Sequence, residues 1–132
     1  GILVERIRCG GAGLIGFISD IGIDTVLSQN KPVITLNGQK GIVESALRAD
    51  VAMIHAAVGD DLGNLVYEKS ARNFNPAMAT AADMVIAEVE SIVDTGSLDP
   101  DAIHTPSAFV DRVVEIGKLR DEYGILEHHV LA

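Results

Sequence analysis

The sequence lacks the features that mark secreted, membrane-spanning or nucleic-acid-binding proteins. Its 132 residues contain no tryptophan and a single cysteine, Cys9. One cysteine excludes an intrachain disulfide framework and a cysteine-rich zinc knuckle. Basic residues are also few, because 10 Lys and Arg stand against 19 Asp and Glu, a formal net charge of −9. We therefore expect neither nucleic acid nor a membrane as a partner, since neutralising phosphates requires a basic surface.

Long hydrophobic runs are absent as well. No apolar stretch approaches the roughly 18 residues that a membrane span requires. The segment Gly1–Arg6 has neither the basic region nor the cleavage site of a signal peptide. The hydrophobic fraction of 48% and the charged fraction of 22% are those of a globular chain. These observations predict one folded domain located in the cytoplasm.

The first residues predict the end of an amphipathic helix. Leu3 and Ile7 are four residues apart, with charged side chains around them. The glycine-rich run at residues 10–13 is expected to stop this helix, because glycine is enriched just past helix ends. The helix has no visible N-cap and the chain opens without methionine. We therefore expect residues 1–116 to be the later part of a longer domain and residues 117–132 to form a charged C-terminal tail.

A hairpin is predicted next. The apolar residues 33–36 read as a strand, and residues 42–44 as its return strand. Asn37-Gly38 lies between them, and Asn-Gly is the strongest short hairpin signal because both residues tolerate positive φ.

Three later segments predict a covered sheet. Residues 49–58 are almost entirely apolar, as in a strand buried on both faces of a parallel sheet. Residues 84–87 predict another buried strand, and residues 109–116 a strand or a short helix. The predicted fold class is therefore α/β, an open, mainly parallel sheet flanked by helices, with an added β-hairpin.

A polar segment precedes a helix predicted over residues 75–82. Asn75 is expected at its N-cap and Pro76 at its first position, a favoured pair. Arg72 and Asn73 lie just before it. The guanidinium donors and the N–H groups of the helix end would suit an anion or a carboxylate. The alternative is that the two asparagines only stabilise a loop.

Gly10, Gly11 and Gly13 form a second candidate feature. Their spacing matches neither the dinucleotide-binding fingerprint nor the phosphate-binding P-loop. They either make a turn packed against a neighbouring element or allow a ligand close to the backbone amides.

The histidines and paired acids give no clear reaction. His55 lies in an apolar strand, as a satisfied core residue or a general base. His104 is expected to hold a loop. Glu88 and Glu90 share one face of a strand, where solvation alone would explain them. His128 and His129 are adjacent and point apart on a regular element, so no metal site is predicted.

Several segments nevertheless occur together in the order of one known family. They are Glu-Arg-Ile-Arg-Cys-Gly-Gly-Ala-Gly-Leu at 5–14, Leu-Arg-Ala-Asp-Val-Ala at 47–52, Gly-Asn-Leu at 63–65, Ser-Ala-Arg-Asn-Phe-Asn-Pro at 70–76, Ala-Ala at 81–82, Glu-Val-Glu at 88–90 and Leu-Asp-Pro-Asp-Ala-Ile-His-Thr-Pro at 98–106. Over about residues 1–114 the chain resembles the α subunit of family I coenzyme A transferases, the 3-oxoacid, acetate and butyrate–acetoacetate type.

The resemblance implies an open α/β fold and a hetero-oligomer of α and β subunits. Such an enzyme moves CoA from an acyl-CoA to a free carboxylic acid through a covalent glutamyl-CoA thioester, in short-chain fatty acid or ketone-body metabolism. CoA thioesters are substrates, and no permanently bound cofactor is expected. The implied partners are the β subunit, other α copies, an acyl-CoA and a carboxylic acid.

The resemblance also places the nucleophilic glutamate in a Ser-Glu-Asn-Gly-type motif of the β subunit. Here Asn37-Gly38 follows Leu36, and no glutamate precedes Asn-Gly. We expect no catalytic nucleophile in this chain, and we expect Gly10, Gly11, Gly13, Arg72, Asn73 and Asn75 to lie at the substrate cleft or a subunit interface.

The chain departs from the family's pattern in three places. Ser19-Asp20-Ile21-Gly22 stands where the family shows Thr-Pro-x-Gly, and Asp24 replaces a glycine. The family's N-terminal half, with its own glycine-rich segment, has no counterpart here. The alternative function is therefore a non-catalytic, truncated structural or interaction domain of the same fold.

Overall fold

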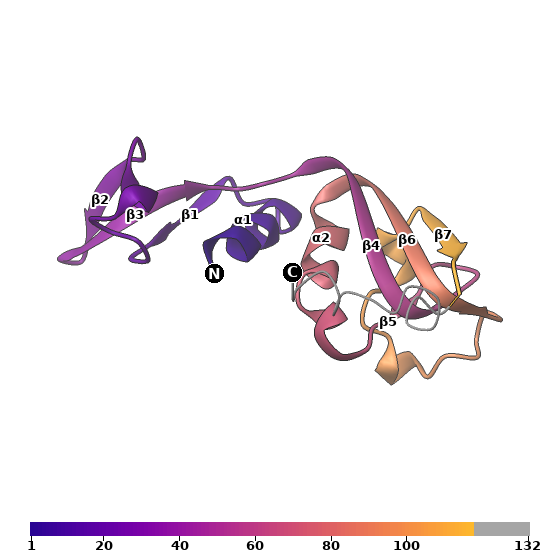
Figure 1. The fold of residues 1–132 in the computed structure, drawn as a ribbon. Coiled ribbons are helices and arrows are strands. Elements are labelled where there is room, and N and C mark those ends of the chain that lie inside the picture. Colours follow the sequence, from indigo (N-terminus) through magenta and orange to yellow (C-terminus); the bar gives the residue numbers. More distant parts are fainter. Residues whose placement is uncertain (118–132) are drawn as a thin grey trace, which may run out of the picture.

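The computed structural model describes residues 1–117, which form two β-sheets and two α-helices (Figure 1). The smaller sheet is antiparallel and has the order β1 (Gly16–Ser19), β3 (Gln39–Ser45), β2 (Val33–Leu36). The larger sheet has the order β5 (Leu65–Val66), β4 (Ala49–Asp60), β6 (Ala82–Val93), β7 (Arg112–Glu115). The helices are α1 (Ile2–Gly11) and α2 (Asn75–Thr80).

The predicted open, mainly parallel α/β sheet is confirmed in the four-stranded sheet. β4, β6 and β7 run parallel, and only the two-residue strand β5 is antiparallel to β4. The alternating segment that follows residues 84–87 continues the same strand, so β6 is 12 residues long. Residues 112–115 form strand β7, which decides between the two structures expected for 109–116.

The predicted hairpin is also confirmed, as part of a larger sheet. β2 and β3 pair from Val33↔Ile42 to Leu36↔Gln39, and Asn37 and Gly38 turn the chain with φ of 50° and 80°. These two positive values are the geometry that Asn-Gly favours in tight hairpins. Strand β1, which the sequence pattern did not predict, pairs with the other side of β3 and completes a three-stranded sheet.

One expectation about helix ends is confirmed and one is wrong. The glycine run at residues 10–13 does end α1, because Gly11 is the last helical residue and Gly13 follows with a φ of 73°. Asn75 is not the N-cap of α2, because Phe74 occupies that place and makes no side-chain capping bond. α2 also ends at Thr80, since Ala82 already begins β6. At Asn75 a tertiary contact, described below, outweighs the local capping signal.

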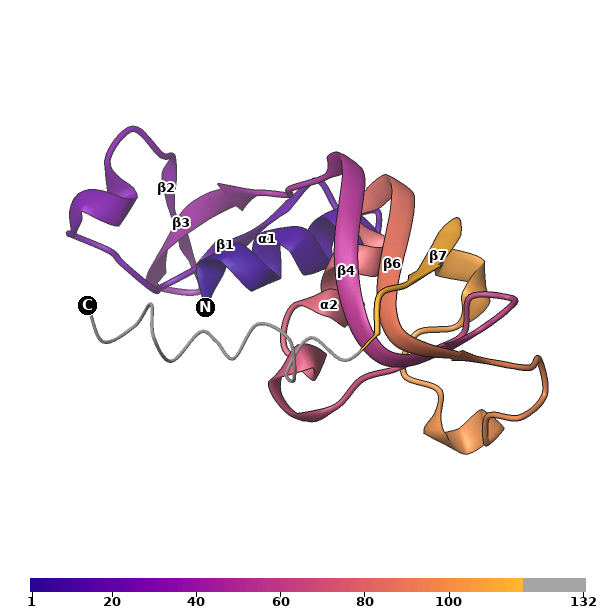
Figure 2. The same ribbon diagram turned by 45° about the vertical axis from the view of Figure 1, so that its right-hand side comes forward.

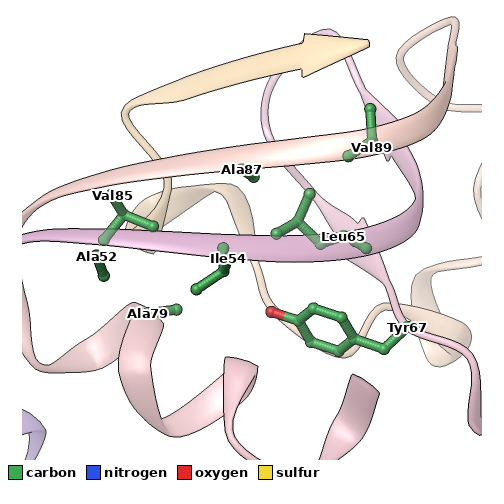
Figure 3. Packing of buried hydrophobic residues seen from close by; sticks show 9 residues of the cluster. Ala52, Ile54, Leu65, Tyr67, Ala79, Val85, Ala87 and Val89 are labelled. Carbon is green, nitrogen blue, oxygen red and sulfur yellow. The ribbon is translucent and has the colours of Figure 1, made fainter. Parts of the chain in front are cut away.

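The core lies between one face of the four-stranded sheet and α2 (Figure 3). Its members are small or branched side chains of β4, β5, β6 and α2 together with one aromatic ring: Ala52, Ile54, Ala56, Leu65, Tyr67, Ala79, Val85, Ala87 and Val89. The alanines bring α2 close to the strands, and the ring of Tyr67 lies on the same side of the sheet as Ala79 (Figure 3). The core thus fixes the start of α2 and the loop after β5, where the candidate residues lie.

The two sheets are joined by the segment from Ser45 to Arg48, which is bonded to α1. Leu47 N–H donates to the Arg6 carbonyl over 2.8 Å, and Arg6 Nε donates to the Ser45 carbonyl over 2.8 Å. Arg48 Nη1 donates to the Gly10 carbonyl over 3.0 Å. Figure 2 shows α1 beneath this junction, between the two sheets. Helix α1 therefore holds the sheets in a fixed arrangement.

No helix within residues 1–117 is long and apolar enough to cross a membrane. Of the charged tail predicted for residues 117–132, all but Gly117 lies outside the described residues, as do His128 and His129.

Candidate functional site

The glycine cluster brings backbones together. A Cβ atom on Gly10 would collide with the carbonyl group of Leu47, and one on Gly11 with the side chain of Thr80 in α2. Gly13 has a φ of 73° in the turn after α1, a conformation that glycine adopts at little cost. The packing alternative therefore has direct geometric support. Gly11 lies against Thr80 at the C-terminal end of α2, whereas Arg72 precedes the start of that helix.

Asn75 ties α2 to the edge of the large sheet. Its Nδ2 donates to the carbonyls of His55 (3.0 Å) and Ala71 (2.9 Å), and its Oδ1 accepts from the His55 N–H at 3.4 Å. The amide thus pairs with both backbone groups of one β4 residue, as a neighbouring strand would. This pairing explains why Asn75 does not cap α2, and it supports the loop-stabilising alternative for this residue.

A second set of contacts holds the loop after β5. His104 Nδ1 accepts from the Tyr67 N–H at 2.9 Å, which leaves the proton of the neutral ring on Nε2. The Tyr67 hydroxyl lies 2.7 Å from Thr105 Oγ1, and the two rings of Tyr67 and His104 stack. Burial, and then the nearby charge of Arg72, lower the pKa of His104. Residue 104 therefore holds a loop, as the sequence predicted.

Arg72 and Asn73 are left exposed by this fixed loop. Within residues 1–117 no side chain forms a hydrogen bond or ion pair with either of them. The short helix η2 (Lys69–Arg72) that carries Arg72 begins at Lys69, whose φ is 49°. Such a backbone conformation is uncommon for a residue with a Cβ and persists where surrounding structure enforces it. The side-chain donors of Arg72 and Asn73 are therefore exposed on a loop of fixed conformation.

His55 lies on the face of the sheet opposite the core, not in the core. Parallel pairing sets it beside Glu88, with His55 Nδ1 3.3 Å from Glu88 Oε1 and Nε2 3.5 Å from Glu90 Oε1. The two acids share one strand face, as predicted, and they flank the imidazole. Within the part of the chain described here, no cluster of His, Cys, Asp and Glu has the geometry of a metal site.

Sequence reasoning missed a buried acid that shapes the neighbouring loop. Asp60 accepts the backbone N–H groups of Leu62, Gly63 and Asn64 and the Asn64 side-chain amide, at 2.8–3.1 Å. Burial of Asp60 works to raise its pKa, but the hydrogen bonds from Asn64, Leu62 and Gly63 outweigh it, so the pKa of Asp60 is lowered. Asn64 Oδ1 in turn accepts the Ser107 N–H at 2.9 Å. The sequence did contain a signal for this contact. Asn64 lies in one family segment, residues 63–65, and Ser107 directly follows another, residues 98–106.

A groove of about 670 Å³ lies elsewhere, between α1 and the small sheet. Arg6, Phe17, Lys31 and Glu44 are among the residues that line it. Lys31 Nζ contacts Glu44 Oε1 at 2.7 Å, and this pair accounts for the buried charge of Glu44. None of the predicted site residues lines the groove.

The candidate residues provide groups that can bind a ligand and do not include an activated nucleophile. The thiol of Cys9 is free and fully buried. A thiol in that setting, without a neighbouring base, is inert. The exposed guanidinium of Arg72 provides a planar fork of donors that fits a carboxylate or a phosphate.

Comparison with known proteins gives the family. The family model "Coenzyme A transferase" matches residues 1–116. The chain is 50% identical over 114 residues to the alpha subunit of the acetate CoA-transferase of Escherichia coli K12, covering 86% of this chain and 52% of that protein. It is 48% identical to one subunit of the succinyl-CoA:3-ketoacid coenzyme A transferase of Xanthomonas campestris pv. campestris strain B100, covering 86% and 47%. The chain thus spans about half the length of these relatives.

Solved structures agree on the fold. The acyl-CoA transferase YdiF of Escherichia coli O157:H7 superposes with a TM-score of 0.81 at 23% identity, covering 87% of this chain and 26% of that one. A variant of the decarboxylase AibA/AibB superposes with a TM-score of 0.71 at 28% identity, covering 94% and 47%. The fold therefore occurs with more than one chemistry. Because the family model covers residues 1–116, this chain belongs to the coenzyme A transferase family.

Proposed function

We propose that this chain is a component of a CoA-transferase that moves CoA between an acyl-CoA and a short-chain or 3-oxo carboxylic acid. The proposal rests on family membership and on one structural observation. Arg72 and Asn73 are exposed, and their side chains have no hydrogen-bond or ion-pair partner within residues 1–117. Hydrogen bonds of the Asn75 and His104 side chains hold the segment that carries them. The relatives named for acetate and for succinyl-CoA with a 3-ketoacid match at nearly equal identity, so the acyl group is left open.

In this proposal the glutamyl-CoA intermediate forms on a partner β subunit. No glutamate of this chain precedes Asn-Gly, the setting that the resemblance implies for the nucleophile. The contribution of this chain is to bind and orient. The Arg72 fork would hold a substrate carboxylate or a partner acid, and Asn73 would add a neutral donor. The assembled enzyme would work in the cytoplasm, where the thiol of Cys9 stays reduced.

The test is Arg72→Ala in the enzyme assembled with its β subunit. Losing a hydrogen-bonded charge contact of about 1.5–3 kcal/mol would lower kcat/KM roughly 10- to 100-fold. Arg72→Lys should recover only part of this, because an ammonium lacks the planar fork. Arg8→Ala is the matched control, since Arg8 is also exposed and pairs only with Glu5 of its own helix. Unchanged kcat/KM and unchanged oligomer size in Arg72→Ala would contradict the proposed role.

The alternative function is a non-catalytic interaction domain of the same fold. The two are separated by asking what co-purifies. A partner chain with a Glu-Asn-Gly motif and acyl-CoA exchange activity support the transferase. A complex with decarboxylase activity instead would align the chain with the AibA/AibB type, and the lower identity to that protein argues against this outcome.

A further inference from the structure

The groove between α1 and the small sheet takes no part in the proposed function. Its volume of about 670 Å³ lies within the roughly 300–1,000 Å³ typical of pockets that hold small molecules. Hydrogen bonds fix its shape. The Val43 N–H donates to the Pro32 carbonyl over 2.8 Å, which holds two of its sides together. The groove is therefore a built feature of the fold, and its lining comes from Arg6, residues 15–18, residues 30–32 and residues 43–45.

Apolar side chains form most of this lining. They are Ile15, Phe17, Ile18, Pro32 and Val43. Ile15 is 97% exposed and Ile18 is 44% exposed, so this wall is open to solvent among the described residues. Covering such a wall with a hydrocarbon chain removes apolar surface from water, which favours binding.

A buried acid and a lysine lie in the same groove. Lys31 Nζ contacts Glu44 Oε1 at 2.7 Å, and the Glu44 side chain is 3% exposed whereas that of Lys31 is 32% exposed. An ammonium group has three N–H donors, and Glu44 takes one of them. Lys31 therefore keeps donors that a ligand in the groove can reach.

Arg6 adds a positive charge that no acid neutralises within residues 1–117. Its Nε donates to the Ser45 carbonyl over 2.8 Å and its Nη2 to the Ser45 hydroxyl over 3.2 Å, and both acceptors are neutral. Nη1 has no partner in this part of the chain. With Lys31 and Glu44, the groove has two cations and one acid, a net charge of +1 on a chain whose formal net charge is −9.

The two cations are held on consecutive residues of one strand. Arg6 is bonded to Ser45 and Lys31 to Glu44, both in β3. This arrangement brings the two positive groups to the same part of the groove, where both attract an anion. The apolar wall lies beside them, since it belongs to the same lining.

We propose that this groove binds a small carboxylic acid with an apolar chain. The carboxylate lies at Arg6 and Lys31, and the hydrocarbon lies against Ile15, Phe17 and Val43. An inorganic anion would leave the apolar wall uncovered, and an apolar amine would meet two cations. Arg72 and Asn73 do not line the groove, so the site is separate from the one in the proposed function. The inference holds whether or not the assembled enzyme transfers CoA.

The experiment is a titration of the full, isotope-labelled chain with sodium octanoate, followed by amide chemical shifts in NMR. We expect saturable shifts confined to residues 15–18, 30–32 and 43–45. Octylammonium chloride is the control, because it has the same hydrocarbon chain and the opposite charge. It should bind at least about tenfold more weakly. The formal net charge of −9 would itself favour the cation, so a preference for octanoate must come from the groove.

Four variants locate the site. Ile15→Glu places an acid on the exposed wall and should weaken octanoate binding at least about tenfold. Leu36→Glu, on the same small sheet at a position 57% exposed and outside the groove, should change it less than about twofold. Lys31→Met should weaken binding about two- to fivefold. Glu44→Gln releases the Lys31 ammonium and should strengthen binding by a similar factor.

Any of four results would overturn the inference. Octylammonium binding as tightly as octanoate would indicate general adsorption of apolar chains. Equal effects of Ile15→Glu and Leu36→Glu would place the ligand elsewhere. Weaker binding in Glu44→Gln would contradict the role of Lys31. A dimer of the free chain in light scattering that Ile15→Glu dissociates would show that a second copy fills the groove. None of these readouts uses CoA transfer, so failure here and failure of the proposed function are distinguishable.

Discussion

Replacing Asn75 tests whether its amide fastens α2 to the sheet. The side chain makes two donor contacts, to the His55 and Ala71 carbonyls, and one longer acceptor contact from the His55 N–H. In Asn75→Ala all three are lost and the carbonyls are left without these donors. In Asn75→Asp the shape is kept, but a carboxylate oxygen replaces the donor and faces two carbonyl oxygens. The isosteric change should therefore be the more harmful one.

The magnitude follows from the contacts. Each of the two donor bonds contributes about 0.5–1.5 kcal/mol net, and the 3.4 Å contact contributes least because hydrogen bonds weaken with distance. Asn75→Ala should thus lower the free energy of unfolding by about 1–3 kcal/mol. Asn75→Asp should lower it by about 1 kcal/mol more, since leaving buried acceptors opposite a charge adds a desolvation penalty.

Urea unfolding followed by circular dichroism measures both changes as shifts in the midpoint at constant m value. Asn73→Ala and Asn73→Asp are the controls, because this neighbouring asparagine is exposed and its side chain has no partner within residues 1–117. Both should stay within about 0.5 kcal/mol of the parent. If Asn75→Asp proves as stable as Asn75→Ala, or if the Asn73 pair costs as much, the bonding assigned to Asn75 is wrong.

Two further predictions concern packing and pH. Gly10→Ala should cost at least about 3 kcal/mol despite the roughly 1 kcal/mol gain in helix propensity, because its Cβ would meet the Leu47 carbonyl. At Gly13 a Cβ atom would meet open space, but the φ of 73° disfavours a side chain, so Gly13→Ala should cost only about 1 kcal/mol in the same urea assay. Equal costs for the two variants would refute the packing argument. The lowered pKa of Asp60 stabilises the fold above the unfolded-state value of about 3.9. That contribution is lost as pH falls through the folded-state pKa of Asp60. The free energy of unfolding of Asp60→Asn should therefore be about 1–3 kcal/mol below that of the parent at pH 7, and this difference should disappear in acid. A difference that persists at pH 2 would contradict the argument.

Parts of both sheets were predictable because their strand and turn signals are local. The apolar run at 49–58 and the Asn-Gly turn correspond to β4 and to the β2–β3 hairpin. The glycine run correctly predicted the end of α1, but not that Gly10 meets the Leu47 carbonyl. The cap of α2 was predicted wrongly, because Asn75 bonds the backbone of His55, which is distant in sequence. Strand β1 was missed for a similar reason, since it exists only through pairing with β3.

The same distinction between local signals and contacts distant in sequence applies to the candidate site. The polar segment at 72–75 stood out as unusual, but only the structure separates Asn75, which is bonded to the sheet, from Arg72 and Asn73, which are exposed. The position of His55 followed from the register with Glu88, and no single-sequence pattern gives the register of a parallel pair.

The junction between the two sheets has a consequence for protein engineering. Its acceptors include the main-chain oxygens of Arg6, Gly10 and Ser45 and also the Ser45 hydroxyl, which accepts from Arg6 Nη2 at 3.2 Å. Leu47 donates through its main-chain N–H. A substitution at Leu47 can therefore be made without removing any of these bonds, and one at Ser45 removes only the bond to its hydroxyl. Arg6 and Arg48 contribute their donors from side chains, and Gly10 is restricted by space. The small sheet could therefore be exchanged for another module if Arg6, Gly10 and Arg48 are retained, because these three residues carry the sequence requirements of the junction.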